Sequence, residues 1–299
     1  MAAPLAPAPR GRIMIDFGAD SPIVCRPALP MDEEPVLAFV AELFDGDDYV
    51  PHVWRDWLTD EAGLLAVAER GGTIVGQGHL ADLGWGETWL EGLRVRTDAQ
   101  GEGVGSHLHD YFVDRWLATA APVVRLATNV ERTAVQRLCE RTGFHRLFAF
   151  DVANAGPADG PPADGWLLAP ISESAGLAEG LPSYLGDSAG LIDLGWRFAE
   201  PKAARLEQVE ALRLGRIEGR PGQALFCVWP GEAEAQVAAI GAEADDLGDL
   251  LLAFRRGMGE ADIERVTWLI PSTLDHQLAE AAGFEIEPNH RLYVYERRR

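Results

Sequence analysis

Residues 95–106 read VRTDAQGEGVGS, and this stretch decides how the first half of the chain folds. The overlapping segment 88–96 alternates between two faces and predicts a β-strand, whereas 104–118 has helical periodicity. Between them lies a Gln-x-x-Gly-x-Gly turn at 100–105. Glycines let the backbone approach a ligand closely, and the first amides of a helix point at an anion. We predict a pyrophosphate-binding turn; the alternative is a tight strand–helix turn that only needs glycine.

The segments around this turn predict a mixed α+β domain. We expect strands at 23–26, 64–69, 73–80, 88–96, 123–127 and 147–152, and helices at 32–44, 52–58, 104–118 and just before 143–144. Arg70-Gly71-Gly72 separates two β-rich runs and predicts a hairpin. Antiparallel runs followed by a strand–helix–strand crossover imply a mixed, mostly antiparallel sheet flanked by helices.

The two halves of the chain resemble each other. Residues 138–144 read LCERTGF and residues 278–284 read LAEAAGF, and both have the pattern of a helix stopped by Gly with Phe turning back to the core. A strand-like run precedes and follows each copy. In the second half these runs are 266–270 and 291–295, and 166–171 leads into a helix-like segment at 172–180. A repeat of this size indicates gene duplication rather than a solenoid.

A composition change separates the halves. Residues 153–165 read ANAGPADGPPADG, which has no large apolar side chain and predicts a linker. We therefore expect a flexible tail at 1–20, a first domain at 21–152, the linker at 153–165 and a second domain at 166–299.

Charge and cysteine content exclude several classes of protein. The 299 residues include 26 Lys and Arg against 47 Asp and Glu, a net charge of −21, which disfavours nucleic acid and anionic membrane surfaces as partners. No segment approaches the roughly 20 apolar residues of a membrane span. Cys25, Cys139 and Cys227 are widely spaced, so they predict neither a disulfide framework nor a metal site. The N-terminus lacks the apolar segment of a secretion signal, and we expect a cytoplasmic protein.

The turn at 100–105 and the segment 138–144, in this order and spacing, resemble the two signature motifs of the Gcn5-related N-acetyltransferase (GNAT) superfamily. The resemblance covers about 23–152 and, more weakly, the second half. It implies acetyl-CoA or another acyl-CoA as cosubstrate and direct acyl transfer to an amine. It also implies two tandem GNAT-like domains. The residues expected to hold acetyl-CoA are Leu93, Val95, Gln100, Gly101, Gly103, Val104, Gly105 and Ser106.

Two residues are candidates for proton transfer. Alternation along 88–96 predicts that Glu91, Leu93 and Val95 share a strand face, and the resemblance implies that an acidic residue on this strand acts as general base. The alternative is a rim carboxylate without a role, and Glu87 is the reserve candidate. The general-acid tyrosine that the resemblance implies falls on Cys139; this thiol or water could serve, but a buried packing residue is the favoured interpretation.

Other polar and aromatic residues have simpler interpretations. Glu102 lies inside the predicted anion turn, where a carboxylate is unfavourable unless it points to solvent. The acidic turn at 45–49 could attract a cationic amine, but a solvated turn is favoured. Trp54 and Trp57 are expected in the core, and His107 and His109 on the surface.

The second half lacks the anion turn. The corresponding segment, 242–254, reads AEADDLGDLLLAF, whose acidic helix start would repel pyrophosphate. We therefore expect a degenerate copy with a structural role. For the whole chain we predict an N-acetyltransferase that acts on a primary amine of a small molecule or peptide, as a monomer or homodimer. The alternative is a non-catalytic acyl-CoA-binding or interaction protein.

Overall fold

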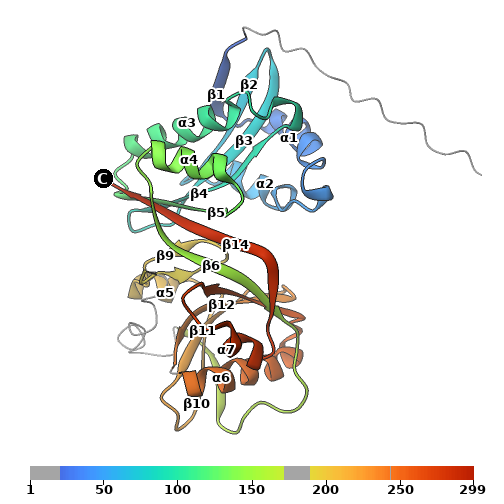
Figure 1. The fold of residues 1–299 in the computed structure, drawn as a ribbon, viewed down its shortest axis with the longest axis vertical. Coiled ribbons are helices and arrows are strands. Elements are labelled where there is room, and N and C mark those ends of the chain that lie inside the picture. The colour runs from blue at the N-terminus through green and yellow to red at the C-terminus, as the bar shows by residue number, and fades with distance from the viewer. Residues whose placement is uncertain (1–20, 172–188, 243) are drawn as a thin grey trace, which may run out of the picture. The chain divides into compact units, whose positions relative to one another are not determined.

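A computed structural model describes residues 21–171, 189–242 and 244–299, whose helices and most strands are labelled in Figure 1. The chain divides into two compact units: unit 1 is Met1–Ala81 with Leu90–Thr119, and unit 2 is Asp82–Trp89 with Ala120–Arg299. The predicted tail at 1–20 and the predicted helix at 172–180 lie outside the described residues.

Unit 1 is a sheet with helices on both faces. Its strand order is β1-β2-β3-β4, and the first three residues of β4 belong to unit 2. Its elements are β1 (Ile23–Pro27), α1 (Glu33–Val40), α2 (Val50–Thr59), β2 (Leu64–Arg70), β3 (Thr73–Asp82), β4 (Glu87–Val95) and α3 (Val104–Ala118).

Apolar side chains of α1 and α2 cover one face of β2 and β3. Trp54 and Trp57 of α2 are buried there among Leu65 and Val67, which confirms their expected place in the core. The helix α3 packs on the other face, where Gly78 of β3 leaves room for it: a Cβ atom there would lie only 2.8 Å from an edge carbon of the Phe112 ring. Burial on both faces therefore fixes β3 between two helical layers.

Unit 2 contains the second half of the chain together with the strands that follow α3. Its main strand order is β5-β14-β6-β13-β12-β11-β10-β7, and β8-β9 form a separate pair. Its elements are β5 (Val123–Asn129), α4 (Thr133–Arg141), β6 (His145–Ala155), β7 (Trp166–Pro170), β8 (Ile192–Asp193), β9 (Phe198–Ala199), α5 (Ala203–Gln208), β10 (Leu212–Ile217), β11 (Gln223–Val228), β12 (Glu234–Gly241), α6 (Ala244–Gly257), β13 (Arg265–Pro271), α7 (His276–Ala281) and β14 (Glu285–Arg298).

The last strand of the chain lies between two strands of the first half. Val294 of β14 pairs with Ala127 of β5 on one side and with Phe148 of β6 on the other, both antiparallel. In turn β6 continues beside β13, where Val152 pairs with Leu269. The sequence predicted only a short strand at 291–295, and its position in the sheet was not expected. Residues of the two halves therefore share one continuous set of ladder hydrogen bonds in unit 2.

Strand directions give an α+β fold with a mixed sheet. Strand β4 runs parallel to β5 over their first residues, and β12 runs parallel to β13, whereas β14 is antiparallel to both of its neighbours. Both predicted helix stops are confirmed: Gly143 and Gly283 have φ values of 80° and 77°, and Phe144 and Phe284 are buried. In the part of the chain that the structure describes, no helix is long and apolar enough to span a bilayer.

Two local predictions are wrong. The helix expected at 32–44 ends at Val40, and Phe44 then takes a left-handed φ of 49°, which a continuing helix does not allow. The linker is expected at 153–165, but its first three residues belong to β6. Ala153 and Ala155 of this strand are buried in the hydrophobic core. Small side chains are no obstacle to a central strand, so composition alone misplaced this boundary.

Candidate active site

The centre of β4 carries a backbone irregularity at Gly92. Its φ is 64°, and a Cβ atom there would lie 2.6 Å from Cη2 of Trp57, so only glycine fits. The amide of Gln77 donates a 2.5 Å hydrogen bond to the Gly92 carbonyl and holds the distorted strand in place. A residue in the left-handed region interrupts the alternation of side chains along a strand.

The predicted common face for Glu91, Leu93 and Val95 is therefore wrong. A Cβ atom on Gly105 would lie 3.8 Å from both Leu93 and Val95, so these two side chains face the start of α3. Glu91 instead contacts His79, whose ring stacks on the indole of Trp57 in α2. The irregular glycine between them separates the carboxylate from the two apolar residues.

Glu91 and His79 form a polar pair within unit 1. Oε1 of Glu91 lies 3.0 Å from Nδ1 of His79, and the histidine ring stacks on Trp57 at 4.6 Å and 13°. His79 is 1% exposed, and its Nε2 lies 4.0 Å from Oδ2 of Asp60, whose side chain is 36% exposed. The imidazole thus orients the Glu91 carboxylate through Nδ1, whereas its Nε2 has no hydrogen-bond partner among the described residues and Asp60 lies beyond hydrogen-bond distance.

His79 is not among the proton-transfer candidates that the sequence predicts. The hairpin prediction did contain the necessary signal, because β3 pairs with β2 and His79 lies opposite Leu65 on the face that α2 covers. What the sequence could not give was the register of β4 against β3. Of the two histidines of α3, His107 is exposed as predicted, whereas His109 is buried, so its predicted surface position is wrong.

The turn before α3 has the backbone expected of an anion site. Gly101 and Gly103 have φ values of 82° and 89°, and Gly103 is the N-cap of α3. No side chain caps this helix start in the described residues, so its first amides are available to an outside acceptor. The amide of Gln100 donates to the carbonyl of Val95 at 3.2 Å and ties the turn to the end of β4. The pyrophosphate of acetyl-CoA fits this chemistry.

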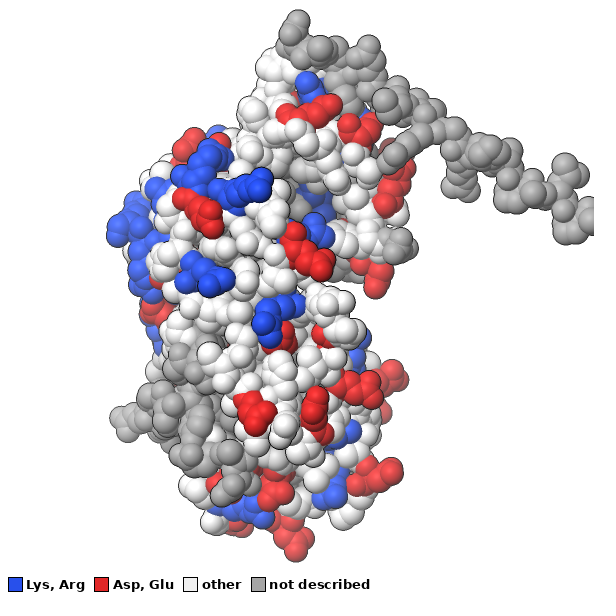
Figure 2. Space-filling view, in the orientation of Figure 1, with Lys and Arg blue, Asp and Glu red and all other residues white. Residues whose placement is uncertain are grey.

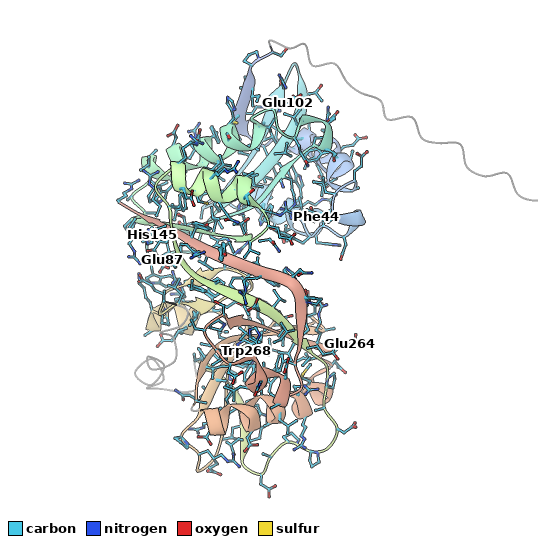
Figure 3. All side chains as sticks on the ribbon, viewed as in Figure 1. Phe44, Glu87, Glu102, His145, Glu264 and Trp268 are labelled. Atoms are coloured by element: carbon cyan, nitrogen blue, oxygen red, sulfur yellow. The ribbon has the colours of Figure 1, made fainter. Side chains whose placement is uncertain are left out.

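The acidic residue of the turn is neutralised within unit 1. Glu102 lies on the turn itself (Figure 3) and forms an ion pair with Arg70 at the end of β2. Val104 contributes only its backbone, because its side chain is 1% exposed and packs toward Gly76. The remaining residues expected to hold acetyl-CoA, Gly105 and Ser106, are the next residues of α3. All eight expected residues thus lie in one continuous stretch of unit 1, from the end of β4 to the first turn of α3.

Cys139 lies on α4 in unit 2 and is completely buried. Burial is the main reason that its pKa rises to about 12, with a small contribution from Glu140 in the same direction. A thiol with this pKa is a weak proton donor at neutral pH. Its environment is that of a small core residue, which agrees with the favoured interpretation.

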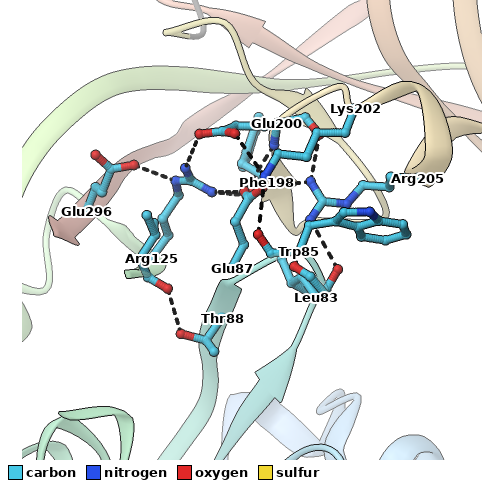
Figure 4. Close-up of polar contacts among 12 residues, drawn as sticks. Leu83, Trp85, Glu87, Thr88, Arg125, Phe198, Glu200, Lys202, Arg205 and Glu296 are labelled. Carbon is cyan, nitrogen blue, oxygen red and sulfur yellow. Dashed lines mark hydrogen bonds and ion pairs between the residues drawn. The ribbon is translucent and has the colours of Figure 1, made fainter. Parts of the chain in front are cut away.

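The reserve candidate Glu87 is part of a buried ion network in unit 2 (Figure 4). Its carboxylate accepts hydrogen bonds from Arg125 and Arg205, the latter at 2.9 Å, and from the backbone N–H of Glu200 at 3.1 Å. Burial alone would raise its pKa, but these hydrogen bonds hold the pKa below its usual value. Arg125 also pairs with Glu296 of β14 at 2.8 Å. A carboxylate held in this way is unsuited to taking a proton.

Asp48, in the acidic turn between α1 and α2, is paired with an arginine. Oδ2 of Asp48 accepts a 2.6 Å hydrogen bond from Nε of Arg94, and its Oδ1 accepts the N–H of Val50 at 3.0 Å. The Arg94 guanidinium also lies 4.8 Å from the ring centre of Phe44 and 5.3 Å from that of Tyr49. Asp48 therefore anchors the start of α2. Among the described residues, no group of His, Cys, Asp or Glu is arranged to hold a metal ion.

The fold and the turn before α3 define a GNAT-like class of protein, and comparison with known proteins supports this class. Residues 30–144 match the acetyltransferase (GNAT) family. A histidine N-acetyltransferase from Xenopus tropicalis is 28% identical over 81 residues, 27% of this chain and 25% of that protein. The human protein named probable N-acetyltransferase 16 is 34% identical over 79 residues, 26% of this chain and 21% of that protein. The matched stretch thus spans about a quarter of these relatives.

Solved structures share the fold over nearly the whole chain. A GCN5-related N-acetyltransferase from Sphaerobacter thermophilus has a TM-score of 0.62 with 15% identity and covers 92% of this chain and 95% of its own. A tandem GNAT protein from the clavulanic acid biosynthesis pathway has a TM-score of 0.58 with 16% identity, covering 93% and 98%. These matches carry the fold alone. Together with the family match over residues 30–144, they support a GNAT-like fold for this chain.

Proposed function

We propose that this chain is an N-acetyltransferase that moves an acetyl group from acetyl-CoA directly to a primary amine of a small molecule or peptide. The observation that carries the proposal is the pairing of Glu91 with the buried His79 of β3, because Glu91 lies on β4, the strand that leads into the uncapped turn before α3. Both features lie in the segment that matches the acetyltransferase family. A proton acceptor and an anion cradle on one short stretch of chain are what acyl transfer to an ammonium requires.

In this proposal the first amides of α3 bind the pyrophosphate of acetyl-CoA, which when bound supplies the activated acyl thioester. Glu91 takes the proton from the acceptor ammonium, directly or through one water, because the nitrogen needs its lone pair. His79 keeps the Glu91 carboxylate oriented through its Nδ1. Trp57 holds the imidazole by stacking and excludes water from its face.

The leaving thiolate receives its proton from water in this proposal. The position that the resemblance assigns to a tyrosine is Cys139, and this thiol is buried with its pKa raised to about 12 by burial. A group that gives up its proton so reluctantly contributes little as an acid at neutral pH. We therefore propose that Cys139 is a packing residue and that Glu91 carries the proton chemistry.

A coenzyme A release assay against a panel of primary amines tests the proposal. We expect turnover with at least one amine, and we expect Glu91→Gln to abolish most of it while acetyl-CoA binding, measured by titration calorimetry, is retained. Tight binding of acetyl-CoA with no turnover on any amine would favour a non-catalytic acyl-CoA-binding protein. The observation that favours a non-catalytic protein is the pKa of Cys139: burial raises it to about 12, so this thiol is a poor general acid for the leaving thiolate.

Two observations bear on the class of acceptor. Two relatives are named histidine N-acetyltransferase, which agrees with an amine on a small molecule, although they match over a quarter of their length. The net charge of −21 suits a cationic acceptor better than an anionic one. Figure 2 shows that basic side chains nevertheless gather on one flank of the face drawn, so the acidic field is uneven.

The tandem arrangement remains part of the proposal. We propose that 21–152 is the catalytic GNAT-like domain and 166–299 a degenerate copy that binds no acetyl-CoA. The support is that α6 begins within an acidic segment and has no Gly-x-Gly turn before it. The tandem GNAT structure of similar fold agrees with this arrangement. We keep a reducing, cytoplasmic compartment as a prediction, because all three cysteines are free thiols in the described chain.

A further inference from the structure

Unit 2 contains a pocket of about 490 Å³ that the proposed transfer chemistry does not use. It lies at the first residues of β12 and beside β13, next to the loop that joins β8 to β9. The lining residues that matter for binding are Trp196, Trp229, Glu232, Glu234, Gln236 and Thr267. A pocket of this size holds a small organic molecule.

The backbone that places one wall of the pocket is strained. Gly195 and Trp196 are both in the left-handed region, with φ values of 76° and 66°. A bulky residue rarely adopts this conformation, and such strain is concentrated at ligand sites. The buried Asp193 holds it: its Oδ1 accepts the N–H of Trp196 at 2.7 Å, and its Oδ2 accepts the side-chain amide of Gln236. The buried Asp193 carboxyl group therefore fixes the positions of two lining residues of the pocket, Trp196 and Gln236.

The two tryptophans give the pocket an aromatic lining. A Cβ atom on Gly195 would lie 3.0 Å from Cζ2 of Trp229, so this indole packs directly against the strained loop. Trp196 stacks near His290 at 6.1 Å and 28° but stays 40% exposed. Indole faces attract cations, and the attraction is larger for Trp than for the other aromatic residues.

The polar groups of the pocket are mainly acceptors. Its lining contains no Lys, Arg or His. Glu234 forms an ion pair with Arg265, whereas no basic side chain in the described chain pairs with Glu232. The hydroxyl of Thr267 donates to Oδ1 of Asn154 at 2.7 Å, which leaves its lone pairs to face a ligand donor. An indole lining with one uncompensated carboxylate matches a donor-rich, positively charged ligand.

We propose that this pocket binds a small organic cation, with a primary or quaternary ammonium group against the indoles of Trp196 and Trp229 and with Glu232 as its counter-charge. The second half of the chain would then carry a ligand site of its own in place of the missing anion turn. The inference stands on unit 2 alone and does not depend on the proposed acetyl transfer.

The test compares two probes of nearly the same shape that differ in charge. Choline carries a quaternary ammonium, and 3,3-dimethylbutan-1-ol is its neutral carbon counterpart. Titration calorimetry on the full chain, without acetyl-CoA, should detect choline and show at least about tenfold weaker binding of the alcohol, the scale of a partly desolvated cation–π contact. Raising the salt concentration should weaken choline binding, because the carboxylate attraction is screened.

Two variants place the site. Glu232→Gln should weaken choline binding by about fivefold, whereas the same change at the exposed Glu207 of α5, outside the pocket, should leave it unchanged. Trp196→Gly removes the indole at a position whose φ favours glycine, so the chain should stay folded by circular dichroism while choline binding is lost.

Three results would overturn the proposal: equal binding of choline and the neutral alcohol, no choline binding at millimolar concentration, or full binding in Glu232→Gln and in Trp196→Gly. Because acetyl-CoA is absent, failure here says nothing about the transferase. Conversely, a chain that fails to acetylate any amine can still bind choline in this pocket.

Discussion

Replacing Glu91 by Gln removes its basicity with the smallest change of shape. The carboxylate lies 3.0 Å from Nδ1 of His79, and the amide oxygen of glutamine can accept the same hydrogen bond. The ring of His79 is also held by stacking on Trp57, which the substitution leaves intact. We therefore expect the free energy of unfolding to change by no more than about 1.5 kcal/mol, the net value of one hydrogen bond.

The expected effect on turnover is far larger. Loss of a positioned general base lowers a rate by about 10² to 10⁴. At about 1.36 kcal/mol per factor of ten, this is roughly 2.7 to 5.4 kcal/mol of transition-state stabilisation. Affinity for acetyl-CoA should stay within about twofold, because the pyrophosphate is proposed to bind at 101–106 rather than at Glu91. Activity and stability should therefore separate clearly in this variant.

The assay is coenzyme A release with a saturating amine from pH 6 to 9.5, alongside urea unfolding at neutral pH. The deficit of Glu91→Gln should shrink as pH rises, because the amine then loses its proton without help. Glu42→Gln, an exposed carboxylate after α1, is the matched control and should behave like the unmodified chain. Full activity of Glu91→Gln at every pH, with loss of activity in Cys139→Ala, would refute the assignment of roles.

Three further changes have distinct expected outcomes. His79→Phe keeps an aromatic ring and removes both nitrogens, so kcat should fall by about tenfold or more with little change in KM, and its pH profile should shift. Gly103→Val, at φ 89°, should weaken acetyl-CoA binding at least tenfold in calorimetry, whereas Gly248→Ala in α6 should not. Glu87→Gln leaves Arg125 under-compensated and should lower the free energy of unfolding by about 3 to 5 kcal/mol at pH 7. Because folding lowers the pKa of Glu87, its contribution is present above the usual value of 4.5 and disappears as pH falls through the folded pKa, so urea unfolding should show the gap between the two chains closing in acid.

Local elements could be predicted where the signal is local. The helix at 104–118 has the predicted bounds because a glycine turn starts it and its periodicity is complete. The hairpin between β2 and β3 follows from Gly71 and Gly72, whose φ values of 56° and 78° suit a two-residue turn. The candidate anion turn could be found for the same reason, since its glycines are adjacent in sequence.

Pairings between distant segments could not be predicted from one sequence. Any strand with the pattern of 291–295 fits several positions in a sheet, and nothing local indicates that β14 lies between β5 and β6. The buried Arg125–Glu296 ion pair is a consequence of that pairing and was equally hidden. The role of His79 was missed on the same grounds, because it depends on how β3 and β4 align.

Glu87 and Glu91 show how far sequence reasoning extends within one strand. Both are carboxylates on β4, four residues apart, and alternation alone treats them as equivalent. Glu87 is enclosed by arginines that lower its pKa and occupy its oxygens, which makes it an anchor. Glu91 has an imidazole beside it, and its side chain is 11% exposed, which leaves it able to exchange a proton. Gly92 distorts the backbone of β4 just after Glu91. The role of each carboxylate therefore depends on this distortion and on the neighbouring side chains, and not on its position in the alternating pattern of the strand.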